Sequence, residues 1–372
     1  MSTRVIEVQD SASVSRAAAR GAKALRAGQL VGFATETVYG LAAMATSAEA
    51  MARLREIKAR PNRPFSVHLG SPADAERYVR PLPEAARRLR DKAWPGPVTL
   101  LVPTGGHLAD AKLRRRAGLG EGLCHEGVIG LRCPDEPVAQ AMLSAVPLPV
   151  VAPSANLAGG ASPRSARDVL AALDGQIDLL IDSGPCRHGA DSTIVRCDGA
   201  AWHMVREGVL DAATIERLWR RTLLLVCTGN TCRSAMAEGL ARVVLAERFG
   251  GADADLGAAG VEVLSAGVFA CDGAPATGDA VAAVAELDAD IAGHRSRMLT
   301  RELIGQADLV LCMTDSHVAE VLRLAPRAGD KVRRLDDQGD VEDPIGGGLS
   351  VYRRTAKRLL KAIRATFSKG LP

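Results

Sequence analysis

Cys227 and Arg233 enclose a short polar loop in "VCTGNTCRSAMAE", directly after an apolar run that predicts a buried strand. A loop between a strand and a helix N-terminus presents backbone N–H groups to an anion, and a guanidinium binds phosphate with two donors. We expect this field to lower the pKa of Cys227, so that its thiolate attacks phosphorus and forms a cysteinyl-phosphate. Asp343 in "EDPIGGG" would then protonate the leaving group. A buried structural cysteine and a surface arginine are the simpler alternative, but the strand, helix and Asp-Pro together favour catalysis.

A second group of polar residues follows a β-type run that ends at Thr35 in "ATETVYGL". The helix after it leads to Lys58, Arg60 and Arg63, and His68 comes shortly afterwards. So many cations in a short span suit a polyphosphate. No G-x-x-x-x-G-K-[ST] motif occurs, so a nucleotide site here must use cations, hydroxyls and backbone groups. Later apolar runs are followed by further polar candidates: Ser154, Asn156, Ser192, Thr193 and Arg206.

The positions of these residues depend on short apolar runs that alternate with helical patterns, which predicts an α/β protein. In the first part of the chain, strands are expected within 30–35, 98–103, 128–132 and 148–156, and helices over 11–27 and 47–59. The second helix has a plausible N-cap in Ser47. From Leu223 a new strand–helix series begins, with strands within 261–267 and 307–313. It predicts a doubly wound parallel sheet.

The length of 372 residues and this change of pattern predict two domains. We expect a first domain over 1–212, a linker helix over 213–222 and a second domain over 223–372. The segment 104–127, where "KLRRR" is followed by glycines, is expected to be a solvated flexible loop.

The composition excludes several classes of protein. Hydrophobic residues make up 47% and charged residues 24%, as in globular proteins, and the net charge of +4 permits an anionic substrate without indicating nucleic-acid binding. No apolar run reaches the length of a membrane span, and the start has no signal-peptide pattern. The eight cysteines are scattered, which favours reduced thiols, and none has zinc-site spacing. A cytoplasmic protein without a membrane partner is expected.

The motifs "VCTGNTCRSAMAE", "SAG" (265–267), "ADLVLCMT" (307–314) and "DPIGG" (343–347) resemble the low-molecular-weight protein phosphatases over about 222–369. The resemblance implies that Cys227 is the nucleophile, Arg233 the phosphate clamp and Asp343 the general acid, with no metal or cofactor. It also implies that Asn230 shapes the loop and that Ser234 hydrogen-bonds the thiolate. The remaining residues of the expected phosphate loop are Thr228, Gly229, Thr231 and Cys232.

One loop position bears on the substrate of this second domain. Tyrosine-directed members of the family usually carry a bulky aliphatic residue where this chain has Thr231, which resembles the branch that acts on phosphoarginine. They also carry aromatic residues after the Asp-Pro, where this chain has Ile345 and Gly346, so an aryl clamp is missing there. These features favour protein phosphoarginine as the substrate, and phosphotyrosine stays open because arginine phosphatases can also carry an aromatic at Ile345. Cys232 is either a packing residue or the partner of Cys227 in an oxidative disulfide.

In the first domain, T-E-T-V-Y-G-L, "KARPNRPFSVHL", "WPGPVTLLV" (94–102), "GLRCPD" (130–135), "APSAN" and "DSTIV" follow the order of the YrdC-like threonylcarbamoyl-AMP synthases. The resemblance covers about 8–210. It implies an α/β fold with a concave, positively charged cavity, in which L-threonine, bicarbonate and ATP give threonylcarbamoyl-AMP and pyrophosphate. The product would pass to the complex that modifies transfer RNA to t6A at position 37.

This resemblance also implies roles for the polar residues. Mg2+ would accompany ATP, and Phe65, which stands where the family usually has Leu, is expected to alter packing only. The residues implied for nucleotide binding are Lys58, Arg60, Arg63, Ser154, Asn156, Ser192 and Arg206. Those implied for threonine binding are Thr35, His68 and Arg132.

A bifunctional enzyme is therefore the leading interpretation, with three alternatives. The first domain would be an RNA- or nucleotide-binding module without synthase activity. The second would be a protein-tyrosine phosphatase or an arsenate reductase, or it would be a regulatory appendage without chemistry. The intact set of Cys227, Arg233 and Asp343 argues against the last of these.

Overall fold

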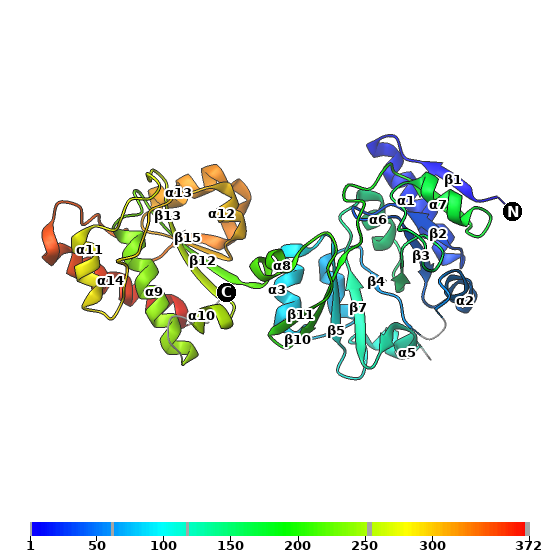
Figure 1. Cartoon of the computed structure of the whole chain (residues 1–372), viewed down its shortest axis with the longest axis horizontal. Coiled ribbons are helices and arrows are strands. Elements are labelled where there is room, and N and C mark those ends of the chain that lie inside the picture. Colours follow the sequence, from blue (N-terminus) through cyan, green and yellow to red (C-terminus); the bar gives the residue numbers. More distant parts are fainter. Residues whose placement is uncertain (1, 61–62, 117–118, 251–254, 369–372) are drawn as a thin grey trace. The chain divides into compact units, whose positions relative to one another are not determined.

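The computed structural model describes residues 2–60, 63–116, 119–250 and 255–368. The chain forms two compact units, unit 1 (Met1–Trp219) and unit 2 (Arg220–Pro372). Both units combine helices with a β-sheet, so the expected α/β class is confirmed for each (Figure 1). No helix among the described residues is long and apolar enough to cross a membrane.

Unit 1 contains most of the strands. Its elements in chain order are β1 (Arg4–Glu7), α1 (Ser11–Arg26), β2 (Val31–Phe33), β3 (Gly40–Met44), α2 (Ala48–Ile57), β4 (Val67–His68), η1 (Pro72–Arg77), α3 (Glu84–Ala93), β5 (Val98–Pro103), α4 (Ala111–Arg114), α5 (Leu119–Leu123), β6 (Cys124–His125), β7 (Val128–Arg132), α6 (Pro137–Ser144), β8 (Val150–Val151), α7 (Ala166–Leu173), β9 (Leu179–Asp182), β10 (Thr193–Asp198), β11 (Ala201–Arg206) and α8 (Ala212–Trp219).

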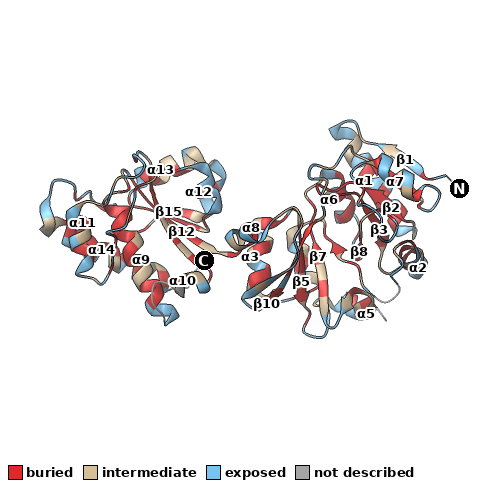
Figure 2. Cartoon of the chain, in the orientation of Figure 1, coloured by how far each residue is buried: buried red, intermediate tan, exposed pale blue. Residues whose placement is uncertain are grey.

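The sheet of unit 1 is mixed, in the order β1-β9-β2-β3-β8-β4-β7-β5-β10-β11, with β6 paired to β7. Successive residues of β3 face opposite sides of it. Leu41 and Ala43 pack in a core with α2 and α3, whereas Ala42 packs in a second core with α1 and α6. The central strands are therefore buried on both faces, as the red strands in Figure 2 show, whereas the edge strands β1 and β11 are mostly exposed. The predicted N-cap is also confirmed, because the Ser47 side chain accepts the backbone N–H of Ala50.

The expectation of a solvated loop over 104–127 is wrong for its described part, and residues 117–118 lie outside that part. The segment forms α4, α5 and β6. Leu108, Leu113, Leu119 and Leu123 are all buried in the larger core of unit 1. The free energy gained by burying these four leucine side chains exceeds the conformational entropy that the flanking glycines and arginines lose in an ordered segment.

The helix α8 belongs to unit 1. Ile215 and Trp219 are buried in its core, and the guanidinium carbon of Arg88 lies 5.2 Å from the centre of the Trp219 ring. The domain limits at 212 and 223 and the linker role of 213–222 stay a prediction.

Unit 2 contains β12 (Arg221–Cys227), α9 (Arg233–Phe249), α10 (Asp255–Ala258), β13 (Val261–Gly267), α11 (Gly278–Ala285), α12 (Arg301–Gln306), β14 (Leu309–Cys312), α13 (Asp315–Leu324), η2 (Pro326–Lys331), β15 (Val332–Arg334) and α14 (Gly348–Ser368). Its sheet has the order β13-β12-β14-β15, and every pair of neighbours is parallel.

The central strand β12 explains why helices cover both faces of this sheet (Figure 1). Leu223, Leu225 and Cys227 pack in one core with α9, α11 and α14. Leu224 and Val226 pack in another with α12 and α13. The predicted doubly wound parallel sheet is therefore confirmed, and it brings the C-terminal end of β12 to the N-terminus of α9.

Candidate active sites

The loop of unit 2 between β12 and α9 begins at Cys227 and ends at Arg233. Asn230 adopts a left-handed backbone conformation with φ of 56°, which Asn tolerates better than most residues. Its side-chain Nδ2 donates to Ser234 Oγ at 2.9 Å and to Ser265 Oγ at 2.7 Å. A Cβ on Gly267 would collide with the carbonyl oxygen of Thr228, so only glycine lets β13 approach the loop this closely.

The Cys227 sulfur is buried at the base of this loop. It lies 2.9 Å from Ser234 Oγ and accepts the backbone N–H of Asn230 at 3.3 Å. Burial raises the pKa of Cys227, although the hydrogen bonds from Ser234 and Asn230 and the charge of Arg233 act in the opposite direction. The predicted lowering of the Cys227 pKa is therefore wrong, because the effect of burying the sulfur outweighs that of the polar contacts.

Arg233 and Asp343 contact each other. The Nη2 atom of Arg233 donates to Asp343 Oδ2 at 2.6 Å and to Thr228 Oγ1 at 3.2 Å, while Nη1 donates to the Val341 carbonyl at 3.0 Å. Arg233 Nε is buried and has no partner among the described residues. This arginine, almost fully buried at the loop, has an unused donor for an anion.

The other expected loop residues also lie around Cys227. Thr231 is partly exposed, and a Cβ at Gly229 would have only Thr231 Oγ1 nearby, at 3.7 Å. Cys232 is buried, and its sulfur lies 3.3 Å from the Tyr352 hydroxyl. Both Cys227 and Cys232 are free thiols. The structure therefore has the packing contacts of Cys232, while its oxidative role stays a prediction.

Two histidines that sequence reasoning missed support the loop. His317 lies 2.9 Å from Thr228 Oγ1 through Nε2 and 2.7 Å from Thr314 Oγ1 through Nδ1. Burial and then the charge of Arg233 lower its pKa to about 4, so it is neutral near pH ~7. His294 Nε2 lies 2.7 Å from the Asn230 carbonyl oxygen. No local sequence signal marks either residue, because each meets the loop only through tertiary packing.

An exposed aromatic residue, which the sequence did not indicate, is joined to the loop through its backbone. The backbone N–H of Phe269 donates to the Thr228 carbonyl at 3.0 Å, yet 70% of Phe269 is exposed. The backbone N–H of Ile345 donates to Asp343 Oδ1 at 3.2 Å, and Ile345 is 66% exposed. Two exposed apolar side chains are thus anchored next to the expected nucleophile segment and the expected acid.

Unit 1 has a cavity of about 610 Å³ on which most of the expected synthase residues converge. Thr35 and Asn156 are not part of its wall and lie behind it, bonded to wall residues. Lining residues that sequence reasoning did not select include Thr99, Glu126, Asp191 and Arg196. The expected residues in its wall are Lys58, Arg60, Arg63, His68, Arg132, Ser154, Ser192 and Arg206.

Lys58 joins α2 to the segment after β8. Its Nζ donates to the backbone carbonyls of Ser154 and Asn156 at 3.0 and 2.8 Å and to Asn156 Oδ1 at 2.7 Å. Burial, followed by the charge of Arg60, lowers the pKa of Lys58 to about 8, while Asp191 acts in the opposite direction. The ammonium is thus fixed at the cavity wall and titrates close to neutral pH.

The expectation that Phe65 alters packing only stays a prediction, and the structure adds a contact to be tested. The guanidinium carbon of Arg60 lies 5.7 Å from the centre of the Phe65 ring, within the range of a cation–π contact. Phe65 is itself buried and lines the cavity. An aromatic ring at this position therefore holds one of the cations that sequence reasoning assigned to the nucleotide.

A buried polar cluster forms the floor of the cavity around Arg132. Its Nη2 donates to Glu36 Oε1 at 2.9 Å and to Thr37 Oγ1 at 2.7 Å, with Thr35 Oγ1 at 3.4 Å. Glu36 is only 2% exposed and is a further residue that sequence reasoning missed, although it stands within the T-E-T-V-Y-G segment. Arg132 Nε is buried without a partner among the described residues, which leaves a donor for a ligand.

His68 and Arg206 complete the wall. Burial, followed by the charge of Arg132, lowers the pKa of His68 to about 3, so its ring is neutral. Arg206 donates to the Ser192 carbonyl at 2.8 Å and forms an ion pair with Asp191 at 3.3 Å. Ser192 Oγ lies 3.0 Å from Thr99 Oγ1. The cavity thus offers cations and hydroxyls, the groups that a phosphate-bearing ligand needs.

The two sites together define a chain with two phosphate-handling α/β units. Residues 23–208 match the family described as Telomere recombination (Sua5, YciO and YrdC), and residues 222–370 match the low molecular weight phosphotyrosine protein phosphatases. The chain is 36% identical to the threonylcarbamoyl-AMP synthase of Bacillus subtilis, over 53% of this chain and 55% of that protein. It is 42% identical to the protein-arginine-phosphatase of B. subtilis, over 38% of this chain and 91% of that protein.

The chain therefore belongs to the Telomere recombination family through unit 1 and to the low molecular weight phosphatase family through unit 2. It spans about half the length of the threonylcarbamoyl-AMP synthases of B. subtilis and Pyrococcus abyssi, at 55% and 54%. A solved structure of P. abyssi Sua5 has a TM-score of 0.50 at 24% identity, over 97% of each chain, a likeness of fold alone. The expected families are confirmed.

Proposed function

We propose that unit 1 makes L-threonylcarbamoyladenylate and pyrophosphate from L-threonine, bicarbonate and ATP. The observation that supports this most is the cavity in which Lys58, Arg60 and Arg63 face the same space as Arg132 and its unused Nε. Three cations suit the phosphates of ATP, and a buried guanidinium suits the carboxylate of threonine. The similarity to threonylcarbamoyl-AMP synthases points to the same reaction.

In this proposal bicarbonate loses hydroxide to give CO2, the threonine amine attacks its carbon, and the proton released from the amine combines with the hydroxide to form water. An oxygen of the resulting carbamate then attacks the α-phosphorus of ATP. The bond from that phosphorus to the bridging oxygen breaks, and pyrophosphate leaves with the electron pair. The developing charge is neutralised by Lys58, Arg60 and Arg63. The nucleotide is positioned by Ser154, Ser192 and Arg206. Catalysis in this proposal therefore relies on positioning and electrostatics. His68, held neutral, contacts threonine without adding charge. The product would then pass to the transfer-RNA-modifying complex for t6A37.

Mg2+ in this proposal arrives with ATP and shields its phosphates. The cavity wall carries two carboxylates, Glu126 and Asp191, and the described residues hold no cluster of three or more His, Cys, Asp or Glu side chains that could form a metal cage. That donor set fits an ion held mainly by substrate phosphates, with one carboxylate in support. We assign that support to Asp191, which also pairs with Arg206 at 3.3 Å.

For unit 2 we propose cysteine-dependent phosphate hydrolysis. The observation that supports it is the convergence of Cys227, Ser234, Arg233 and Asp343 on one loop. Cys227 gives up its thiol proton to Asp343 as the substrate binds, the thiolate attacks phosphorus, the bond to the leaving group breaks, and Asp343 passes that proton to the leaving group. Water then attacks the cysteinyl-phosphate while Asp343 takes its proton, which releases phosphate and restores the thiolate. Arg233 and the loop N–H groups hold the phosphoryl oxygens.

The proposed substrate of unit 2 is protein phosphoarginine. Thr231 and the Asp343 carboxylate both border the loop and are groups that can accept hydrogen bonds from a guanidinium. Phe269 adds an exposed aromatic face beside Thr228, suited to a planar cation. The 42% identity to a protein-arginine-phosphatase favours this choice over phosphotyrosine.

The test of the synthase is pyrophosphate release by the full chain with ATP and Mg2+, with L-threonine and bicarbonate each added or withheld. The proposal requires release that depends on both. Lys58→Ala should reduce it strongly, whereas Cys227→Ser should leave it unchanged. Release without dependence on threonine, or none from a folded chain, would reduce unit 1 to a nucleotide- or RNA-binding module.

The test of the phosphatase compares phosphoarginine and phosphotyrosine in the same peptide sequence. The proposal expects a higher kcat/KM for phosphoarginine, and no turnover of either peptide by Cys227→Ser. Preference for phosphotyrosine would assign unit 2 to the tyrosine-directed branch. Turnover of arsenate with a thiol donor, and of neither peptide, would make it a reductase.

A further inference from the structure

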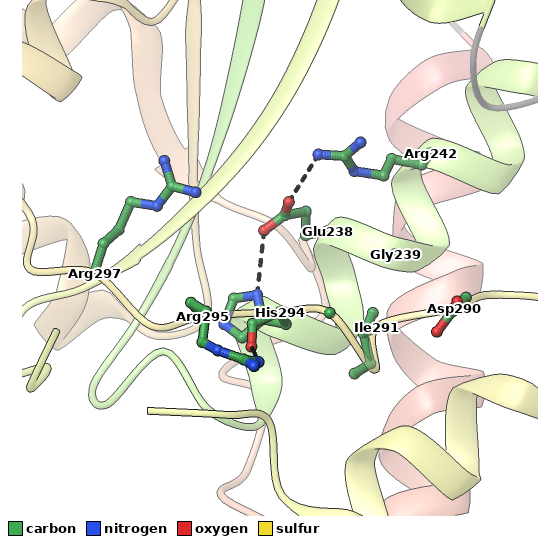
Figure 3. A pocket seen from close by; sticks show the side chains of 9 residues that line it. Glu238, Gly239, Arg242, Asp290, Ile291, His294, Arg295 and Arg297 are labelled. Carbon is green, nitrogen blue, oxygen red and sulfur yellow. Dashed lines mark hydrogen bonds and ion pairs between the residues drawn. The ribbon is translucent and has the colours of Figure 1, made fainter. Parts of the chain in front are cut away.

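Unit 2 has a cavity of about 380 Å³, and no residue of the Cys227 loop is part of its lining. Figure 3 shows Glu238 at its centre, with Arg242 on one side and His294 below. Arg297 faces the same space from the opposite side, and Arg295 lies next to His294. Neither the phosphatase chemistry proposed above nor the family motifs use these arginines.

The local chain explains why Arg295 and Arg297 share this cavity. They flank Ser296, which is buried and donates from Oγ to the Cys271 carbonyl. In an extended segment alternate side chains point to opposite sides, so anchoring Ser296 inward turns both arginines outward. The Arg297 side chain has no ion pair or hydrogen bond among the described contacts, and Arg295 bonds only the neighbouring His294 carbonyl, at 2.7 Å.

The third arginine comes from α9. Arg242 donates to Glu238 Oε1 at 2.9 Å and to the Val263 carbonyl at 3.0 Å. The helix can approach the segment 290–295 because residue 239 is glycine. A Cβ there would lie 2.5 Å from the Ile291 side chain, inside contact distance. The close approach brings Arg242 and the loop arginines around one space.

The charges that face the cavity favour an anion. Three arginines line it, against two carboxylates, Glu238 and Asp290. Glu238 is already satisfied by Arg242 and by Ser265 Oγ at 2.5 Å, and His294 Nδ1 lies 3.7 Å away. An anion therefore meets arginine donors in excess of the resident carboxylates.

The cavity is connected to the Cys227 loop through Asn230. His294 Nε2 lies 2.7 Å from the Asn230 carbonyl, and the Arg297 backbone N–H donates to Asn230 Oδ1 at 2.8 Å. Asn230 in turn donates its own N–H to the Cys227 sulfur. A ligand that draws the Arg297 segment toward itself would therefore move the residue that holds the nucleophile loop.

We propose that this cavity binds a small phosphate-bearing anion, pyrophosphate more tightly than phosphate, and that its occupancy slows the phosphatase. Three guanidinium groups match an ion with two phosphoryl groups better than one with a single group. Its volume is within the range of small-ligand sites. The two ions are the products of the activities proposed for units 1 and 2, so the coupling rests on those proposals, whereas the binding does not.

Binding is tested by counting bound equivalents of radiolabelled pyrophosphate, and separately of phosphate, on the full chain by equilibrium dialysis. The double variant Arg295→Ala/Arg297→Ala should bind one equivalent fewer than the wild type. The matched control is Arg301→Ala, an exposed arginine of α12 outside the cavity, which should bind as the wild type does. Equal counts in the wild type and the double variant would overturn the site.

Two further features keep the binding test decisive. Arg297→Lys retains a cation and should keep the equivalent with weaker affinity, which separates loss of charge from misfolding. Loss of a phosphate equivalent without loss of a pyrophosphate equivalent would overturn the preference for the larger ion. Because no turnover is needed, failure of the proposed phosphatase activity would not alter this count.

Coupling is tested with p-nitrophenyl phosphate, which does not depend on phosphoarginine specificity. In the wild type, pyrophosphate should lower kcat about two-fold or more as well as raise KM, because it acts at both the loop and the cavity. In the Arg295→Ala/Arg297→Ala variant it should raise KM alone. Purely competitive inhibition of the wild type would overturn the coupling, even if the bound equivalent is confirmed.

Discussion

Arg233 Nη2 donates to Asp343 Oδ2 at 2.6 Å, so the residue expected to bind phosphate and the residue expected to supply a proton are joined as an ion pair. Arg233 is almost fully buried, whereas 44% of the Asp343 side chain is exposed. A phosphate dianion at Cys227 would compete with Asp343 for the same nitrogen. Substrate binding would thus free Asp343 from the ion pair, so that it can carry a proton to the leaving group.

Asp343→Asn should slow hydrolysis most where the leaving group needs a proton. Removing a general acid costs about 10²–10⁴-fold. We expect a loss of about this size for phosphoarginine peptides and a much smaller loss for p-nitrophenyl phosphate, whose leaving group departs as a stable anion. The measurement is kcat for both substrates. A similar decrease with both would show that the variant damages phosphate binding through Arg233 instead.

The affinity of unit 1 for ATP should decrease as the pH rises through about 8, the value to which the pKa of Lys58 is lowered. Below this pH the ammonium is charged and binds phosphate; above it the amine is neutral and loses that attraction. The KM for ATP is measured between pH ~6.5 and ~9.5 in the wild type and in Lys58→Arg, whose guanidinium stays protonated. An unchanged rise of KM in Lys58→Arg would assign the titration to another group.

The same pKa shift makes a prediction for stability. Since the folded pKa of Lys58 lies below its ordinary value of 10.5, the unfolded state binds more protons between pH ~8 and ~10.5. The free energy of unfolding therefore gains a contribution as the pH rises through this window, and this gain is absent below it. Denaturant titrations of the wild type and Lys58→Met should diverge here. Parallel curves would contradict the shift.

Phe65→Leu should weaken ATP binding modestly and leave the fold intact. The substitution preserves an apolar side chain at a buried site but removes the ring under Arg60. Loss of a cation–π contact of about 0.5–1 kcal/mol corresponds to a two- to five-fold increase in KM for ATP. Arg60→Ala/Phe65→Leu is the check, since the ring should matter little once Arg60 is gone. An additive effect in the double variant would mean that Phe65 acts through packing.

Phe269→Ala should reduce kcat/KM for phosphoarginine peptides by about five-fold or more, the size expected for a desolvated contact between an aromatic face and a guanidinium. Phe249→Ala provides the control, because Phe249 is also an exposed phenylalanine of unit 2 but lies at the end of α9. For both variants we measure kcat/KM on the phosphoarginine peptides and, for comparison, the pyrophosphate release proposed for unit 1. Equal effects of the two substitutions would remove Phe269 from the substrate site.

The sequence predicted the features that depend on local chain geometry. The strand–loop–helix run from β12 to α9 keeps Cys227, Asn230, Arg233 and Ser234 within one contiguous loop, so their proximity follows from spacing. The cap at Ser47 follows from a local residue preference, and the parallel sheet of unit 2 follows from strands that alternate with helices. Most of the residues that the ordered motifs of unit 1 singled out likewise lie in the cavity wall.

The tertiary structure alone decided the contacts between distant segments. Glu36 meets Arg132, His317 meets Thr228, and the Arg60 guanidinium lies over Phe65 only after strand register and helix packing are set. The direction of the Cys227 pKa shift also depends on burial, which no spacing reports. No sequence motif marks the cavity around Arg242, Arg295 and Arg297. It forms only because Gly239 lets α9 approach a loop that follows β13 in the chain. Neighbouring residues determine local geometry, whereas burial and long-range pairing are properties of the packed chain.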